Sequence, residues 1–257
     1  MLNLLIKYAK RLLTLLIVAA LFTTAGYCYE QKDQYIKYSI EETIEVVNNR
    51  ACEVIIRVGE YDNKPGKRIY LNDINIHYKD IPTDIKIQSD SHGAYIHEYD
   101  INMKEAKALV KQLRARGVNA QLQYTSYKSE DLNAAGRIAN KSNPYLYVSM
   151  HHNYYDSNAK GYFAMYNPND NDSKAIANRL SNAIANNGIV KQRENQPNTG
   201  YIGELNALNK STTGVLLELG FFSNGTELKN ICSDRYVDYV SNKLADELVK
   251  ILNEQYR

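Results

Sequence analysis

The sequence predicts a single α/β domain with a mostly parallel twisted sheet and helices on both faces. From about residue 83 to the C-terminus, apolar runs typical of buried strands alternate with helical patterns. The connections between these segments are short, as in parallel sheets with crossover helices. The chain has 257 residues, of which 44% are hydrophobic and 23% charged, and this composition is typical of a globular protein.

Residues 1–27 are predicted to be a signal peptide or a signal anchor. Lys7, Lys10 and Arg11 precede an apolar run over 12–20, and small residues follow around 23–26. This order is typical of a secretory signal, and the run is shorter than the ~20 residues of a spanning helix, which favours cleavage. We therefore expect an exported protein, in the periplasm, cell wall or extracellular space, with membrane contact only through an uncleaved N-terminus.

The mature chain has no excess of basic residues. The charged residues among the first 29 are all basic. Without this segment the chain contains 28 Lys+Arg and 29 Asp+Glu. This balance argues against nucleic acid as a partner.

Residues 30–82 are predicted to form an N-terminal helix and a strand or hairpin. Ser39 and Glu42 have capping-box spacing, and apolar residues at helical intervals predict a helix over about 40–57. Alternation in RIYLNDINIHYKDI predicts the strand or hairpin. Cys52 and Cys232 allow two interpretations, a disulfide in an exported protein or two buried thiols.

Residues 83–257 are predicted to form the catalytic domain, and their elements follow in a regular order. The strands are DIKIQ, VNAQLQY, YLYVSM, a short GYFAMYN and GVLLELGFF, and the helices cover about 100–116, 129–141, 173–187 and 234–254.

Four side chains able to bind a metal or move protons are expected at one edge of this sheet. His92 follows DIKIQ, His151 follows YLYVSM, Glu218 lies near the end of GVLLEL, and Glu98 opens a helix. Functional loops leave the carboxyl ends of parallel strands, so these groups can meet. Two imidazoles and a carboxylate leave one zinc position for water, and Glu218 is suited to take the proton.

Each of these residues also has an ordinary interpretation. A histidine after a strand is often a surface residue, and Glu98 at a helix start also complements the helix dipole. Glu218 interrupts an apolar strand, where its alternative is a structural ion pair, because an unpaired buried carboxylate is costly. The joint placement favours the catalytic interpretation.

The chain from about residue 85 to 251 resembles the zinc-dependent N-acetylmuramoyl-L-alanine amidases. The segments that carry the resemblance are SDSHGA, EYDIN, SMHHN and LELGFFSN. The resemblance implies that His92, Glu98 and His151 are zinc ligands and that Glu218 is the catalytic carboxylate. It places His152 beside the site. The loop between His92 and Glu98 is short, which makes Asp90 or His97 an alternative ligand.

The expected function is therefore zinc-dependent hydrolysis of the amide bond between N-acetylmuramic acid and L-alanine, with peptidoglycan as the partner. Two alternatives stay open: a zinc peptidase that acts within the stem peptide, and a wall-binding protein without metal. The sequence does not indicate an activator protein.

Overall fold

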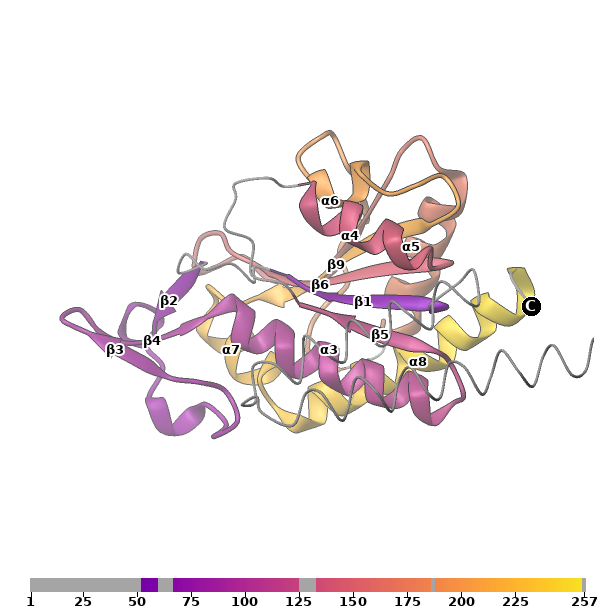
Figure 1. The fold of residues 1–257 in the computed structure, drawn as a ribbon. Coiled ribbons are helices and arrows are strands. Elements are labelled where there is room, and N and C mark those ends of the chain that lie inside the picture. The colour runs from indigo at the N-terminus through magenta and orange to yellow at the C-terminus, as the bar shows by residue number, and fades with distance from the viewer. Residues whose placement is uncertain (1–51, 60–66, 125–132, 186–187, 256–257) are drawn as a thin grey trace, which may run out of the picture. The chain divides into compact units, whose positions relative to one another are not determined.

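The computed structural model describes residues 52–59, 67–124, 133–185 and 188–255 (Figure 1). These residues belong to one compact unit, Cys52–Arg257. The predicted signal over 1–27 and most of the predicted helix over 40–57 lie outside the described residues. No helix in the described ranges is long and apolar enough to cross a membrane.

A six-stranded sheet forms the centre of the unit, in the order β5-β1-β6-β9-β7-β8. The first four strands are parallel, β7 runs antiparallel to β9, and β8 pairs parallel to β7. This arrangement confirms the predicted fold class. The strands are β5 (Ala120–Gln123), β1 (Val54–Val58), β6 (Leu146–Asn153), β9 (Thr213–Phe221), β7 (Phe163–Tyr166) and β8 (Gln196–Pro197).

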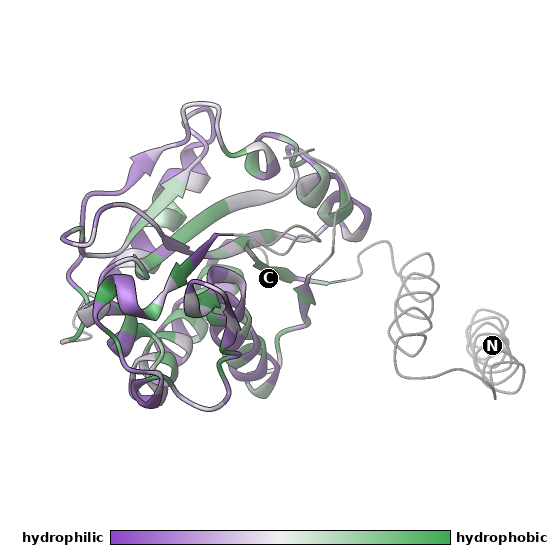
Figure 2. Cartoon of the chain, turned by 90° about the vertical axis from the view of Figure 1, so that its left-hand side faces the viewer, coloured by the Kyte–Doolittle hydropathy of each residue, from purple (hydrophilic) through white to green (hydrophobic). Residues whose placement is uncertain are grey.

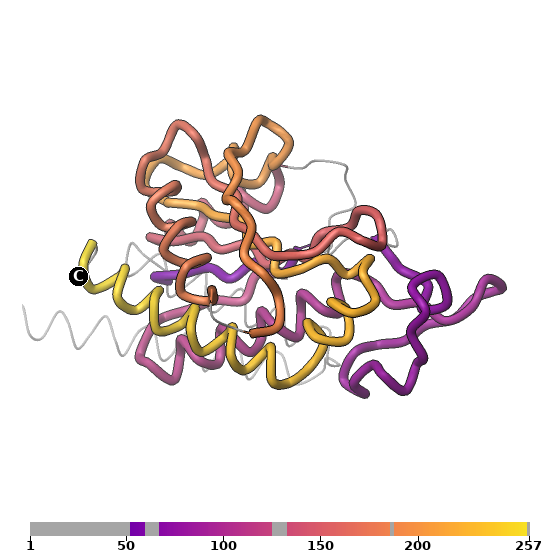
Figure 3. Tube along the Cα trace, turned by 180° about the vertical axis from the view of Figure 1, so that it is seen from behind, coloured from indigo at the N-terminus to yellow at the C-terminus, as the bar shows by residue number. Residues whose placement is uncertain are grey.

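Helices cover both faces of the sheet. The larger hydrophobic cluster joins one face to α3 (Glu98–Ala115), α5 (Asn171–Ala183), α7 (Gly225–Ile231) and α8 (Asp234–Gln255). The smaller cluster joins the opposite face to α4 (Ala134–Ser142) and α6 (Gly203–Asn206). Figure 3 shows α8, in yellow, running along the first face. In Figure 2 the central strands are largely hydrophobic, whereas much of the outer surface is hydrophilic.

Strand β1 corrects the sequence analysis, which predicts a helix over 40–57. Residues Val54–Val58 form a strand between β5 and β6, and all five are buried. A fully buried parallel strand is apolar on both faces, so it lacks the alternation that marks a strand in sequence. The branched residues of VIIRV suit a strand better than a helix.

A second, three-stranded antiparallel sheet has the order β2-β4-β3, with β2 (Arg68–Tyr70), β3 (Gln88–Asp90) and β4 (Gly93–His97). The 3-10 helices η1 (Leu71–Ile74) and η2 (Tyr78–Asp80) follow β2, so only the start of the predicted hairpin is a strand. The predicted strand DIKIQ is absent from the main sheet, because only its last residue begins a strand and that strand belongs to the small sheet.

Cys52 and Cys232 lie on opposite faces of the main sheet. Cys52 is buried in the smaller cluster and Cys232 in the larger one. They are therefore not joined to each other by a disulfide.

Candidate active site

Strands β6 and β9 bring His151 and Glu218 together at the carboxyl end of the parallel sheet. The two residues are direct partners in the ladder, so their side chains lie on the same face, toward α4 and α6. The register shifts between His151 and Asn153. Such a bulge redirects side chains near functional sites.

Glu98 reaches this edge from the first turn of α3. Its side chain is 1% exposed, and Oε1 accepts hydrogen bonds from Asn102 Nδ2 and from the backbone N–H of His152, both at 3.1 Å. Nδ1 of His151 lies 3.2 Å from the same oxygen. Burial alone would raise the pKa of Glu98, but the contact with His151 and these hydrogen bonds hold it below its ordinary value.

The other nitrogen of His151 faces a second carboxylate. Nε2 lies 3.6 Å from Oε1 of Glu204, on α6. The Tyr147 hydroxyl donates to Oε2 of Glu204 at 3.0 Å, and Arg57 Nε lies 3.7 Å from that oxygen. Burial would raise the pKa of Glu204, but His151 and Arg57 lower it to about 2. Burial would lower the pKa of His151, yet Glu204 and Glu98 raise it well above its usual value.

Glu204 and Arg57 were not predicted from the sequence as members of this site. Arg57 carries a signal that could have identified it, because it is the one charged residue in the apolar run VIIRV. Glu204 lies in a four-residue helix within a polar segment, and no pattern in the sequence marks it.

Glu218 is partly buried, and its Oε2 is enclosed without a hydrogen-bond partner among the described residues. Burial raises the pKa of Glu218 to about 7. The positive charge of His151 lowers this pKa, whereas the negative charge of Glu98 raises it further. A carboxyl with this pKa exchanges protons readily near neutral pH, as a general acid or base must.

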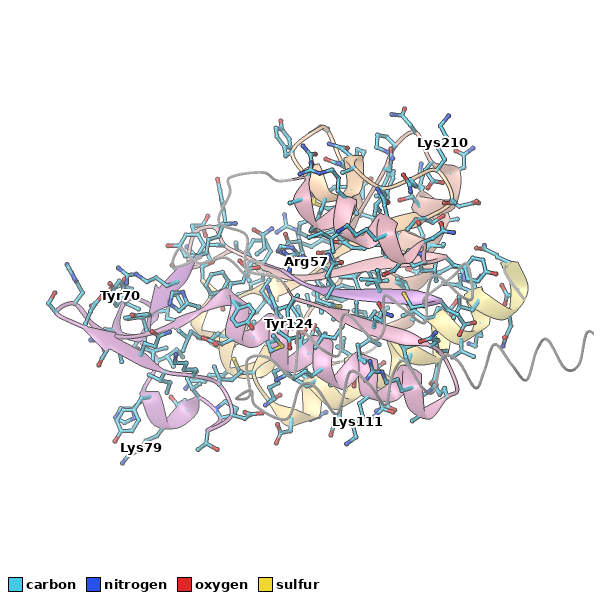
Figure 4. All side chains as sticks on the ribbon, viewed as in Figure 1. Arg57, Tyr70, Lys79, Lys111, Tyr124 and Lys210 are labelled. Atoms are coloured by element: carbon cyan, nitrogen blue, oxygen red, sulfur yellow. The ribbon has the colours of Figure 1, made fainter. Side chains whose placement is uncertain are left out.

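His92 is not brought to this group. It lies at the turn between β3 and β4, with a side chain 77% exposed that contacts Asp90 and the ring of Tyr70. Strand β4 separates His92 from Glu98, and five extended residues span about 17 Å. Figure 4 shows Tyr70 on the small sheet, well away from Arg57 on the main sheet.

Neither alternative ligand lies with Glu98 and His151 in the contacts that the structure shows. Asp90 is at the same turn as His92 and bonds to Arg68 and Tyr70. The ring of His97 packs edge-on against Tyr95.

The donor chemistry around His151 suits a metal ion in part. Among the described residues, no three histidine, cysteine or carboxylate side chains lie close enough to hold one. Glu98 and His151 nevertheless supply one oxygen and one nitrogen donor. Buried oxygens of Glu98, Glu204 and Glu218 have no hydrogen-bond partner in the described ranges. Such oxygens are costly unless a cation or a donor meets them. Glu98 and His151 therefore supply two of the donors that a metal site needs, and the described residues supply no third one beside them.

His152 contacts the Glu98 carboxylate through its backbone N–H, whereas its ring bonds to Asn102. Its side chain is 0% exposed and points to the α3 face, opposite to His151. His152 therefore belongs to the interior and does not face the substrate side.

A family model described as N-acetylmuramoyl-L-alanine amidase matches residues 87–250, more than half of the chain. The germination-specific N-acetylmuramoyl-L-alanine amidase of Bacillus subtilis (strain 168) is 26% identical over 137 residues, 51% of this chain. The chain spans about half of that relative, 55% of its length.

Solved structures show the same fold. An N-acetylmuramoyl-L-alanine amidase from Clostridium difficile 630 superposes with a TM-score of 0.61 at 22% identity, covering 79% of this chain and 97% of that one. The CwlD amidase from Clostridioides difficile, solved in complex with the GerS lipoprotein, gives a TM-score of 0.59 at 21% identity, covering 79% and 100%.

Proposed function

We propose, from the premise that the chain belongs to the N-acetylmuramoyl-L-alanine amidase family, that it hydrolyses the bond between N-acetylmuramic acid and the L-alanine of the peptidoglycan stem peptide. The observation that carries this proposal is the buried Glu98–His151 pair beside Glu218, at the carboxyl end of the parallel sheet. Family membership agrees with the enzyme class predicted from the sequence.

The proposed reaction depends on zinc, with Glu98 and His151 among its ligands. Bound zinc would polarise the scissile carbonyl and lower the pKa of a water molecule. A third protein ligand is not identified among the residues that the structure describes. Glu204 contributes by facing the other nitrogen of the His151 ring, and Arg57 contributes by pairing with Glu204.

Glu218 is proposed to move the proton. With a pKa near 7, its carboxylate accepts a proton from the attacking water. The same carboxyl then donates that proton to the leaving nitrogen of L-alanine, which returns Glu218 to its starting state. Oε2 of Glu218 is enclosed and has no hydrogen-bond partner among the described residues, so no hydrogen bond at this oxygen competes with protonation of the carboxyl.

The proposed setting is outside the cytoplasm, because peptidoglycan lies there and the first 27 residues have the order of a secretory signal. Fractionation of cells that produce the full chain tests this part. The protein is expected in the wall or medium fraction, and its retention among cytoplasmic proteins would contradict export.

The product of the reaction tests the function. The purified protein is incubated with peptidoglycan, its zinc content is measured, and soluble products are identified by mass spectrometry. We expect about one zinc per chain and stem peptides with a free L-alanine amino terminus. Shortened stem peptides would favour a peptidase. Binding to peptidoglycan without cleavage or zinc would favour a wall-binding protein.

A further inference from the structure

A row of buried polar side chains leads from Glu98 into the protein interior. Glu98, Asn102 and Glu105 are spaced by four and three residues, so they lie on one face of α3. That face meets β6 at His152. All four residues are almost fully buried in an otherwise hydrophobic layer.

Asn102 makes three hydrogen bonds that fix its orientation. Nδ2 donates to Glu98 Oε1 and to the Gly59 carbonyl, both at 3.1 Å. Both amide hydrogens are thereby used, which leaves Oδ1 to face the ring of His152. His152 Nδ1 lies 2.8 Å from Oδ1, so this ring nitrogen must carry the hydrogen.

Glu105 holds the far side of the same ring. Its Oε1 lies 3.4 Å from His152 Nε2, and neither carboxylate oxygen has a hydrogen-bond partner among the described residues. The ring is therefore held between an amide oxygen and a carboxylate from successive turns of α3.

Stability alone does not account for this arrangement. An apolar pair of similar volume at His152 and Glu105 would be about as stable as a buried charged pair, because desolvation offsets the attraction. An apolar pair cannot donate a hydrogen bond to Asn102, as the His152 ring does. Without that hydrogen bond, the Asn102 side chain would lose part of what orients it toward Glu98.

We propose that Asn102, His152 and Glu105 are positioning residues that fix the carboxylate of Glu98. Asn102 and the His152 backbone N–H hold Oε1, and the His152 ring holds Asn102. Oε2 of Glu98 is buried and has no hydrogen-bond partner in the described ranges. The inference rests on the proposed function only in that it takes Glu98 as a site residue.

A matched pair of double variants tests the hydrogen bond that the His152 ring donates to Asn102. His152→Leu with Glu105→Leu removes the ring and the charge together. His152→Asn with Glu105→Leu differs only at position 152, where the asparagine Nδ2 takes the place of the ring Nδ1 and can donate to Asn102. The readout is hydrogen exchange of the backbone amide at position 152, which donates to Glu98 Oε1.

We expect the leucine double variant to exchange this amide about tenfold faster than the wild type, because a hydrogen bond to a charged group is loosened. The asparagine double variant should stay within about threefold of the wild type. Equal exchange in both double variants would overturn the inference. If either double variant does not fold, the same exchange rate is measured in Asn102→Ser. An Asn102→Ser variant whose amide at position 152 exchanges as slowly as in the wild type would also overturn the inference.

Tyr236→Phe is the matched control. It removes a buried hydroxyl that donates to the Leu219 carbonyl at 2.7 Å on the same face of the sheet, without contact to Glu98. Exchange at position 152, corrected for global stability, should not change in this variant. A change as large as that of the leucine double variant would show a general loss of packing and overturn the inference.

Zinc affinity gives a second readout. Loss of residues that orient a ligand typically weakens metal binding by about 10–100-fold, and we expect this of the leucine double variant only. If the wild type binds no zinc, the proposed zinc dependence fails. The exchange measurement still decides whether Asn102 and His152 orient Glu98.

Discussion

Gly59→Ala is expected to displace His151 without removing any polar group. Gly59 follows β1 and lies against the His151 ring. A methyl group added at Gly59 would lie 2.3 Å from Cε1 and 2.4 Å from Nε2 of that ring. Ordinary contact begins at 3.4 Å, so the ring must move by about 1 Å. This shift disturbs the contacts of His151 with Glu98 and Glu204.

The expected cost follows from that displacement. Misplacing a site residue by about 1 Å reduces turnover by about 10²-fold, and overpacking a filled site destabilises by about 1–3 kcal/mol. We measure hydrolysis of peptidoglycan by release of stem peptides, and the free energy of unfolding by urea denaturation.

His151→Ala provides the control for this prediction. Gly59→Ala in the His151→Ala background has no ring to displace, so it should cost almost no stability. At unstrained positions Gly→Ala stabilises by about 0.4–1 kcal/mol, which sets the upper limit of the expected gain. The same loss of stability in both backgrounds would refute the proposed contact. Wild-type turnover in Gly59→Ala would refute the need for this ring position.

Three further predictions concern separate contacts. His152→Leu leaves Glu105 buried without its partner and should lower the free energy of unfolding by about 3–5 kcal/mol, as measured in urea. Adding Glu105→Leu should restore most of this stability. A double variant that is as unstable as His152→Leu would argue against an ion pair between His152 and Glu105. His92→Ala should keep zinc content and turnover within about twofold of the wild type, since His92 is exposed and separate from the site. Loss of zinc in this variant would show that His92 is a zinc ligand. Lys104→Met should cost about 1 kcal/mol, because Lys104 Nζ bonds Asp234 at 2.7 Å and Asp84 at 3.0 Å, but both aspartates are solvent-exposed. Burial would lower the pKa of Lys104, but Asp234 and Asp84 raise it above its ordinary value, so their contribution is present below the ordinary lysine pKa of about 10.4 and is lost at higher pH. A difference in stability that persists at pH 12 would contradict this assignment.

The longer elements after residue 98 could be predicted because their patterns are long and periodic, whereas the short β8, α6 and α7 are not predicted. Helix α3 places Ile101, Leu109 and Leu113 on its buried side, and β6 and β9 are apolar runs between turns. Strand β1 could not be distinguished from a helix, because a short run that is buried on both faces has no alternation.

The same limitation explains the outcome at the site. The meeting of Glu98, His151 and Glu218 could be predicted, because the sequence indicates a helix and two strands at these positions and the carboxyl ends of parallel strands share one edge. His92 does not join them, because DIKIQ is not a strand of the main sheet, where β1 is the strand that precedes α3 along the chain. Glu204 is brought in by the fold of a short helix, which leaves no periodic signal in the sequence.

The release of stem peptides by Glu218→Ala, relative to the wild type, tests the central claim most directly. Product with a free L-alanine amino terminus is quantified by mass spectrometry from peptidoglycan incubated with each full-length protein. Removal of a positioned acid–base group should lower the rate by about 10²–10⁴-fold while zinc content stays unchanged. A Glu218→Ala variant that releases these peptides at a near-normal rate would contradict the proposed mechanism.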